Sequence, residues 1–85
     1  MSNAKTGTHR AIPEPVAAAL AAVLRGHRER TGLTQEGLAA RAHVSVQMVR
    51  RLEAATANPT IGTLHAITTA MDVAWTDLLM EVDAK

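Results

Sequence analysis

The chain has 85 residues, which allows one small domain, and its lack of cysteine excludes disulfides, thiolate metal sites and a cysteine nucleophile. Hydrophobic residues make up 47% of it, with 17 alanines and one aromatic residue, a composition that favours packed helices over a sheet. The net charge of +1 divides into +5 for residues 1–51, with eight basic and three acidic side chains, and −4 for residues 52–85, with one basic and five acidic, so the first part is suited to meet a polyanion.

The N-terminal segment, residues 1–14, contains small polar residues and prolines without hydrophobic periodicity, so we expect a flexible arm there. Residues 2–4 (SNA) resemble a scar left by an expression vector and are given no functional interpretation. The domain itself is expected over residues 15–82, followed by a tail of residues 83–85. The longest apolar run, residues 16–24, is too short to span a membrane, and we expect a cytoplasmic protein.

Hydrophobic residues recur at helical spacing in five segments, which predicts an all-α fold. The first predicted helix spans residues 15–30 and ends before Gly32. Thr34, Ser45 and Thr60 each precede a further helix as a candidate N-cap. The later helices are predicted over residues 35–42, 46–54, 61–71 and 75–82. Inward positions are predicted for Val16, Leu20, Val23, Leu24, Ile61, Leu64, Ile67, Met71, Leu78 and Leu79.

The helices over residues 35–42 and 46–54 are short and separated by a tight turn, a pattern typical of a helix-turn-helix pair. Such a pair needs apolar inward positions, a small residue where the helices cross and an apolar residue after the turn. Those places are filled by Leu38, Ala39, Ala42, Val44, Val49 and Leu52. Gln47, Arg50 and Arg51 then remain on the outer side of the second helix.

Four motifs occur in a fixed order and at distances that rarely combine by accident. They are GLTQEGLA at residues 32–39, Val44-Ser45, Leu52-Glu53 and Asn58-Pro59-Thr60. With them, residues 24–79 resemble the helix-turn-helix domain of the phage-repressor and Cro type, also called the xenobiotic-response-element family. The resemblance implies a five-helix, lambda-repressor-like fold in which the helix over residues 45–54 lies in a DNA major groove.

The resemblance also implies a role for individual residues. Ser45, Val46, Gln47 and Arg51 are similar to the family's base-reading sites. Gln47 is suited to pair with adenine and Arg51 with guanine, while Val46 offers apolar contact such as that to a thymine methyl group. DNA phosphate contact is expected of Gln35, Arg41 and Arg50. A partly buried ion pair of the scaffold is expected between Arg28 and Glu53.

The sequence departs from the family at three helix ends where family members usually have glycine. His43, Ala55 and Asp72 occupy these positions. His and Asp tolerate a left-handed backbone better than Ala does, so we expect the loop around Ala55 to be rearranged.

Neither a cofactor site nor a metal site is indicated. The four histidines are separated by 18, 16 and 22 residues, which matches no metal-ligand spacing. A phosphate-binding glycine loop and an activated nucleophile are also missing from the sequence, so we do not expect an enzyme.

The leading functional prediction is a sequence-specific, double-stranded DNA-binding transcriptional regulator, a repressor that occupies an operator in the nucleoid. Two copies on neighbouring half-sites require a homodimer, for which the C-terminal part offers surplus apolar residues. These are Met71, Trp75, Met80 and Val82. One alternative is an antitoxin that represses its own operon and holds a basic toxin. The other is a protein-interaction module that keeps the fold without DNA binding, favoured by the non-polar Val46 and Met48.

Overall fold

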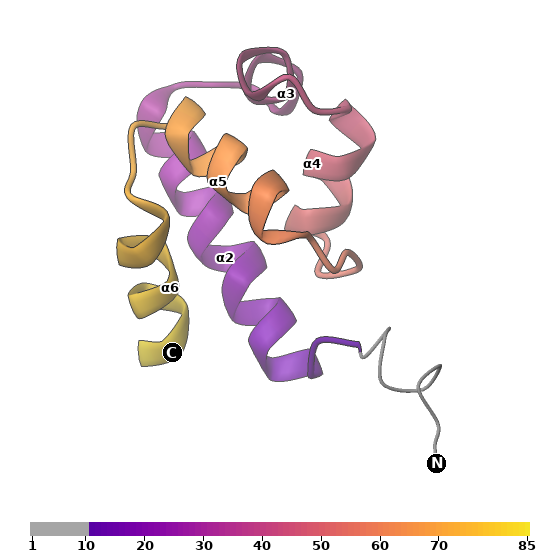
Figure 1. The fold of residues 1–85 in the computed structure, drawn as a ribbon, viewed down its shortest axis with the longest axis vertical. Coiled ribbons are helices and arrows are strands. Elements are labelled where there is room, and N and C mark those ends of the chain that lie inside the picture. The colour runs from indigo at the N-terminus through magenta and orange to yellow at the C-terminus, as the bar shows by residue number, and fades with distance from the viewer. Residues whose placement is uncertain (1–10) are drawn as a thin grey trace.

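The computed structural model describes residues 11–85, which form five helices and no strand (Figure 1). The helices are α2 (Glu14–Thr31), α3 (Gln35–Ala42), α4 (Val46–Glu53), α5 (Ile61–Ala70) and α6 (Trp75–Ala84). The predicted all-α class with five helices is therefore confirmed. Most of the expected N-terminal arm falls on residues 1–10 and lies outside the described residues, and α2 begins one residue before its predicted start.

Three of the helices begin at a side chain that accepts a hydrogen bond from the first turn, as predicted. The hydroxyl of Thr34 accepts from the backbone N–H of Gly37 at 2.9 Å, and the hydroxyl of Ser45 accepts from that of Met48 at 3.1 Å. Thr60 does the same for Thr63 at 3.0 Å. Each cap satisfies an N–H group that the helix itself leaves without a partner.

Left-handed backbone follows four of the helices. Gly32 has φ 76°, and the non-glycine residues His43, Ala55 and Asp72 have φ 58°, 61° and 59°. The predicted rearrangement around Ala55 is therefore wrong. The loop keeps the usual geometry because the N–H of Thr56 donates to the carbonyl of Arg51 at 2.9 Å, which closes the end of α4.

The core lies where all five helices meet. Its most deeply buried apolar side chains, each at most 2% exposed, come from every helix: Leu24, Leu38, Val49, Ile67 and Leu78. Two predicted inward residues are instead exposed, Val16 to 45% and Ile61 to 61%. Both lie in the first turn of their helix, and Val16 lines an open hollow between α2 and the end of α6 instead of the core.

The helices are arranged so that α3 and α4 form one side of the molecule and α6 another (Figure 1). The long helix α2 packs against both α4 and α6, while α5 packs against α3 and α6. In Figure 1, α2 and α5 lie between α4 and α6. The side of α4 that faces away from α2 is therefore not covered by α6.

Candidate nucleic-acid interface

Helix α4 has two chemically different sides. Val49, Leu52 and Glu53 face the interior and are 1%, 3% and 6% exposed. Gln47 and Arg51 are exposed on the outer side, and within residues 11–85 their side chains make no hydrogen bond or ion pair. Both side chains are thus available to an external partner.

The other two expected base-reading residues are less free. The hydroxyl of Ser45 accepts the capping hydrogen bond of α4, which leaves its proton as a donor. Val46 is partly buried against the core and presents only part of its surface. The first turn of α4 therefore offers a small polar group and a limited apolar contact beside Gln47.

The three expected phosphate-binding residues are placed differently from one another. Arg41 is exposed in the last turn of α3. Arg50 is exposed on α4, where its Nη2 donates to Oε2 of Glu36 at 3.0 Å. The side-chain amide of Gln35 turns inward and donates to Oε1 of Glu53 at 3.1 Å. The side chain of Gln35 thus points toward the scaffold, and only the start of α3 itself is left facing outward.

Glu53 is the centre of a network that ties α4 to α2 and α3. Its carboxylate accepts hydrogen bonds from Arg28, whose Nε lies 2.6 Å from Oε2 and whose Nη2 lies 3.0 Å from Oε1. Arg25 lies 3.4 Å from Oε1 and also donates to the backbone carbonyl of Glu53. Arg28 further donates to the carbonyl of Leu33 at 2.9 Å. These bonds fix the C-terminal end of α4 on the scaffold.

The electrostatics of this network keep Glu53 charged. Burial raises the pKa of the Glu53 carboxyl, but hydrogen bonds from Arg28 and Gln35 and the charge of Arg28 outweigh it, so the pKa lies below its usual value. The hydrogen bond to Glu53 likewise raises the pKa of Arg28 above that of a free arginine. A buried carboxylate with these partners is a stable anion at neutral pH.

Sequence reasoning missed Arg25, the inward turn of Gln35, the Glu36 to Arg50 pair and the link between His27 and Glu81. His27 Nε2 lies 2.9 Å from Oε2 of Glu81 and connects α2 to α6. Arg25 had a signal, because it lies one helical turn before Arg28 and shares its side of α2. The other contacts join residues far apart in the sequence, where spacing carries no information.

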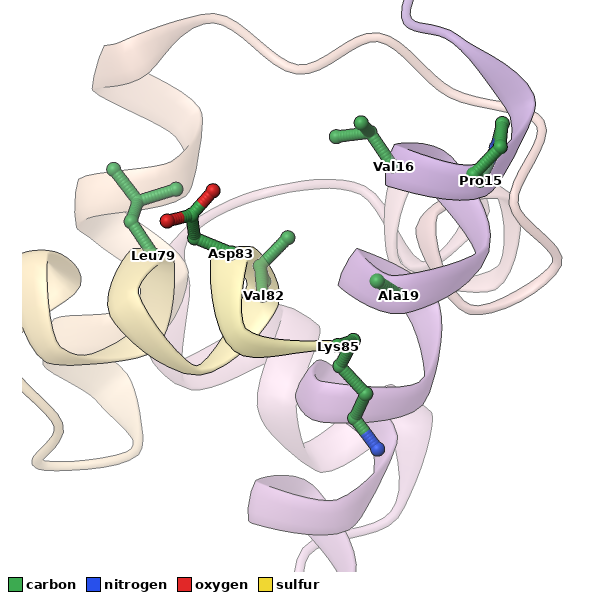
Figure 2. Close-up of a pocket in the computed structure, with 7 residues that line it drawn as sticks. All are labelled: Pro15, Val16, Ala19, Leu79, Val82, Asp83 and Lys85. Carbon is green, nitrogen blue, oxygen red and sulfur yellow. The ribbon is translucent and has the colours of Figure 1, made fainter.

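The four residues expected at a dimer interface differ in exposure. Met71 is 4% exposed and belongs to the core, so it has almost no surface left for a partner. Trp75 and Val82 are partly buried, and Met80 is 70% exposed. Val82 lines a hollow between the end of α6 and the start of α2. Figure 2 shows its lining residues, which are Pro15, Val16, Ala19, Leu79, Val82, Asp83 and Lys85.

Residues 19–79 match the family described as the helix-turn-helix domain. The chain belongs to this family. The match extends from the first half of α2 to α6, so it includes the α3 and α4 pair.

No match was found among curated proteins. Along residues 11–85 there is no helix long and apolar enough to cross a membrane.

Solved structures resemble this helix-turn-helix domain over most of its length. The clp gene regulator ClgR from Corynebacterium glutamicum is 30% identical, with a TM-score of 0.78 over 85% of this chain and 78% of that one. An HTH_3 family transcriptional regulator from Vibrio cholerae is 25% identical, with a TM-score of 0.71 over 78% of this chain and 38% of that one. The restriction-modification controller protein C.Esp1396I, at 23% identity, shares the fold with a TM-score of 0.72 over 82% of this chain and 94% of that one.

These likenesses confirm the expected lambda-repressor-like helix-turn-helix fold. Together, the family and the similarity to regulators support a DNA-binding regulator of transcription. Helix α4 occupies the place of the second helix of the motif, which is the one that enters the major groove in such proteins.

Proposed function

We propose that this protein is a sequence-specific, double-stranded DNA-binding repressor that reads an operator through the major groove with α4. The observation that carries the proposal is the outer side of α4, where Gln47 and Arg51 are exposed while the opposite side is fixed by Val49, Leu52 and Glu53. A helix held in this way is already ordered before it enters a groove, which lowers the entropic cost of binding.

Base reading is assigned to the outer residues of α4. The side-chain amide of Gln47 can donate through its nitrogen to N7 of adenine and accept through its oxygen from N6. Arg51 can donate to O6 and N7 of guanine. Ser45 can donate its hydroxyl proton, and the exposed part of Val46 can contact a thymine methyl group. A bidentate pair of this kind discriminates against the wrong base by about 1 to 3 kcal/mol.

Phosphate binding is assigned to Arg41, Arg50 and the backbone N–H groups at the start of α3. The side-chain amide of Gln35 already donates to Glu53, so Gln35 contributes through its place in the first turn of that helix. Arg50 first has to leave Glu36 if its Nη2 is to reach a phosphate. These contacts set the register of the protein on DNA but carry no sequence information.

The decisive experiment selects bound fragments from random duplexes and then compares Gln47→Ala and Arg51→Ala with the wild type. We expect one enriched sequence for the wild type, and for Arg51→Ala a loss of about 1 to 3 kcal/mol together with relaxed preference at one base pair. Lys85→Ala removes the same charge from the end of α6 and serves as the matched control. Its preference should equal that of the wild type.

Two outcomes would contradict the proposal. If no sequence is enriched although binding occurs, the protein binds DNA without reading it. If no duplex binds even at low salt, the fold serves another purpose, such as contact with a protein partner.

A further inference from the structure

The ion pair between Glu36 and Arg50 joins the two helices of the motif on their exposed side. Glu36 lies in the first turn of α3, and its side chain is 66% exposed. The side chain of Arg50, on α4, is 49% exposed, and its Nη2 lies 3.0 Å from Oε2 of Glu36. The start of α3 and the outer part of α4 are the places assigned above to phosphate and base contact, so this pair lies on the surface that would face DNA.

We propose that Glu36 limits the affinity of this protein for DNA by competing with phosphate for Arg50. The inference rests on the proposed DNA-binding function and refines it. In the free protein the carboxylate of Glu36 holds the guanidinium of Arg50. A phosphate that binds Arg50 has to displace this carboxylate, and Glu36 then remains nearby as an unpaired negative charge.

Both consequences weaken contact with the DNA backbone. A paired Arg50 adds no net charge to the local surface, so it releases fewer counterions from DNA than a free arginine would. Glu36 also repels neighbouring phosphates, and it weakens the favourable field of the N-terminus of α3 that would otherwise attract them. Arg51, which makes no ion pair within the described residues, is not subject to this competition.

The effect should be measured most cleanly in binding without sequence preference. Such binding depends almost entirely on phosphate contacts, whereas operator binding adds the base contacts of Gln47 and Arg51. A residue that weakens phosphate contacts therefore leaves base reading with a larger share of the total affinity. Because operator binding uses the same phosphate contact, Glu36 lowers the affinity for every duplex, and its effect is read most directly where no base contacts add to it.

The pair has little importance for the fold. An exposed ion pair contributes little to stability, and α3 and α4 are already joined by buried residues such as Leu38 and Val49. Glu53 is different, because it is buried and has several partners. Substitution of Glu36 can therefore be used to test binding while the helices stay in place.

The test compares Glu36→Gln with the wild type on a random-sequence duplex over a range of salt concentrations. We expect Glu36→Gln to bind about two- to fivefold more tightly at moderate salt, and its slope of log K against log salt to be steeper by about 0.9. Asp77→Asn makes the same change in net charge on α6 and is the matched control. It should keep the wild-type slope. Circular dichroism and thermal melting verify that each variant is folded.

A second comparison separates competition from simple repulsion. In the Arg50→Gln background, Glu36→Gln should no longer steepen the slope, because no guanidinium is left to release. The inference is overturned if Glu36→Gln matches Asp77→Asn, or if the slope steepens equally without Arg50. Failure of every variant and of the wild type to bind any duplex would instead overturn the proposed function.

Discussion

Ala55 shows how a single residue can occupy a backbone conformation that its side chain disfavours. Its φ of 61° lies in the left-handed region, where a Cβ atom costs about 1 to 2 kcal/mol. The neighbouring Thr56 donates both its backbone N–H and its hydroxyl to the carbonyl of Arg51, at 2.9 and 3.2 Å. These bonds close the end of α4 and hold Ala55 in place.

Glycine should therefore stabilise the protein at the non-glycine left-handed positions. We expect Ala55→Gly and His43→Gly each to raise the free energy of unfolding by a few tenths to about 1 kcal/mol, since the strain relieved exceeds the added entropy of the unfolded chain. Urea denaturation measures the change. Ala54→Gly is the control, because Ala54 has φ −92° and gains nothing from glycine. A lower stability for Ala55→Gly than for Ala54→Gly would argue against the strain.

Helix α4 has eight residues and is too short to be stable alone, so its order depends on the contacts made at its two ends. The hydroxyl of Ser45 caps its beginning, and the carboxylate of Glu53 anchors its end to Arg28 and Gln35. The anchor is ionic, so the order of α4 depends on pH.

Acidification should weaken this anchor. The pKa of Glu53 is lower in the folded protein than its ordinary value of 4.5, so its contribution to stability is complete above that value and is lost as the pH falls through the lower, folded pKa. Thermal melting between pH 7 and pH 3 should show a loss of stability in the acidic part of this range. Arg28 stays charged throughout and is left without its partner.

The variant Glu53→Gln isolates this contribution from that of the other carboxylates. It should be about 3 kcal/mol less stable than the wild type at pH 7, because Arg28 loses a buried partner, and the difference should shrink as the pH falls. A difference that stays constant down to pH 3 would show that the charge of Glu53 does not support the fold.

The elements that depend on local chemistry could be predicted from the sequence. Thr34, Ser45 and Thr60 mark helix starts because a cap needs only its own first turn. The start of α3 at Gln35 was predicted correctly for this reason. Val16 and Ile61 were predicted wrongly, because periodicity identifies the apolar side of a helix but not how closely neighbouring helices cover its first turn.

The candidate site was only partly accessible to the same reasoning. Exposure of Gln47 and Arg51 follows from helical spacing. The engagement of Gln35 by Glu53 and of Arg50 by Glu36 does not, because these contacts depend on how α3 crosses α4. The angle between two helices is set by tertiary packing, which one sequence does not display.

Basic and acidic residues are concentrated in different helices of the molecule. Within the described chain, residues 11–51 hold six basic and three acidic side chains, a net charge of +3, and include α3 and most of α4, whereas residues 52–85 carry −4 and include α6. Since α6 packs on α2 and α5, its acidic residues lie away from the outer side of α4 (Figure 1). A polyanion is therefore attracted to one side of the molecule.

We expect the protein to associate with a second copy of itself through the side formed by α6. The exposed Met80 and the hollow lined by Val82 and Val16 provide apolar surface for a second copy (Figure 2). We expect a homodimer at tens of micromolar by analytical ultracentrifugation, and a monomer for Met80→Glu, because a charge there would be buried by the partner.

The matched control introduces the same charge at Thr69, which is exposed on α5. Thr69→Glu should remain dimeric. A monomeric wild type would contradict the prediction for the free protein, and a dimeric Met80→Glu would place the contact elsewhere on the surface.

The freedom of the Gln47 and Arg51 side chains has a consequence for the evolution of this protein. Since these side chains support nothing else among residues 11–85, mutations at the two positions can accumulate without a loss of folding. Duplicated copies of the gene could thus diverge toward new target sequences while inheriting an unchanged scaffold. A library randomised at the two positions should consist largely of folded proteins that differ in the DNA they select.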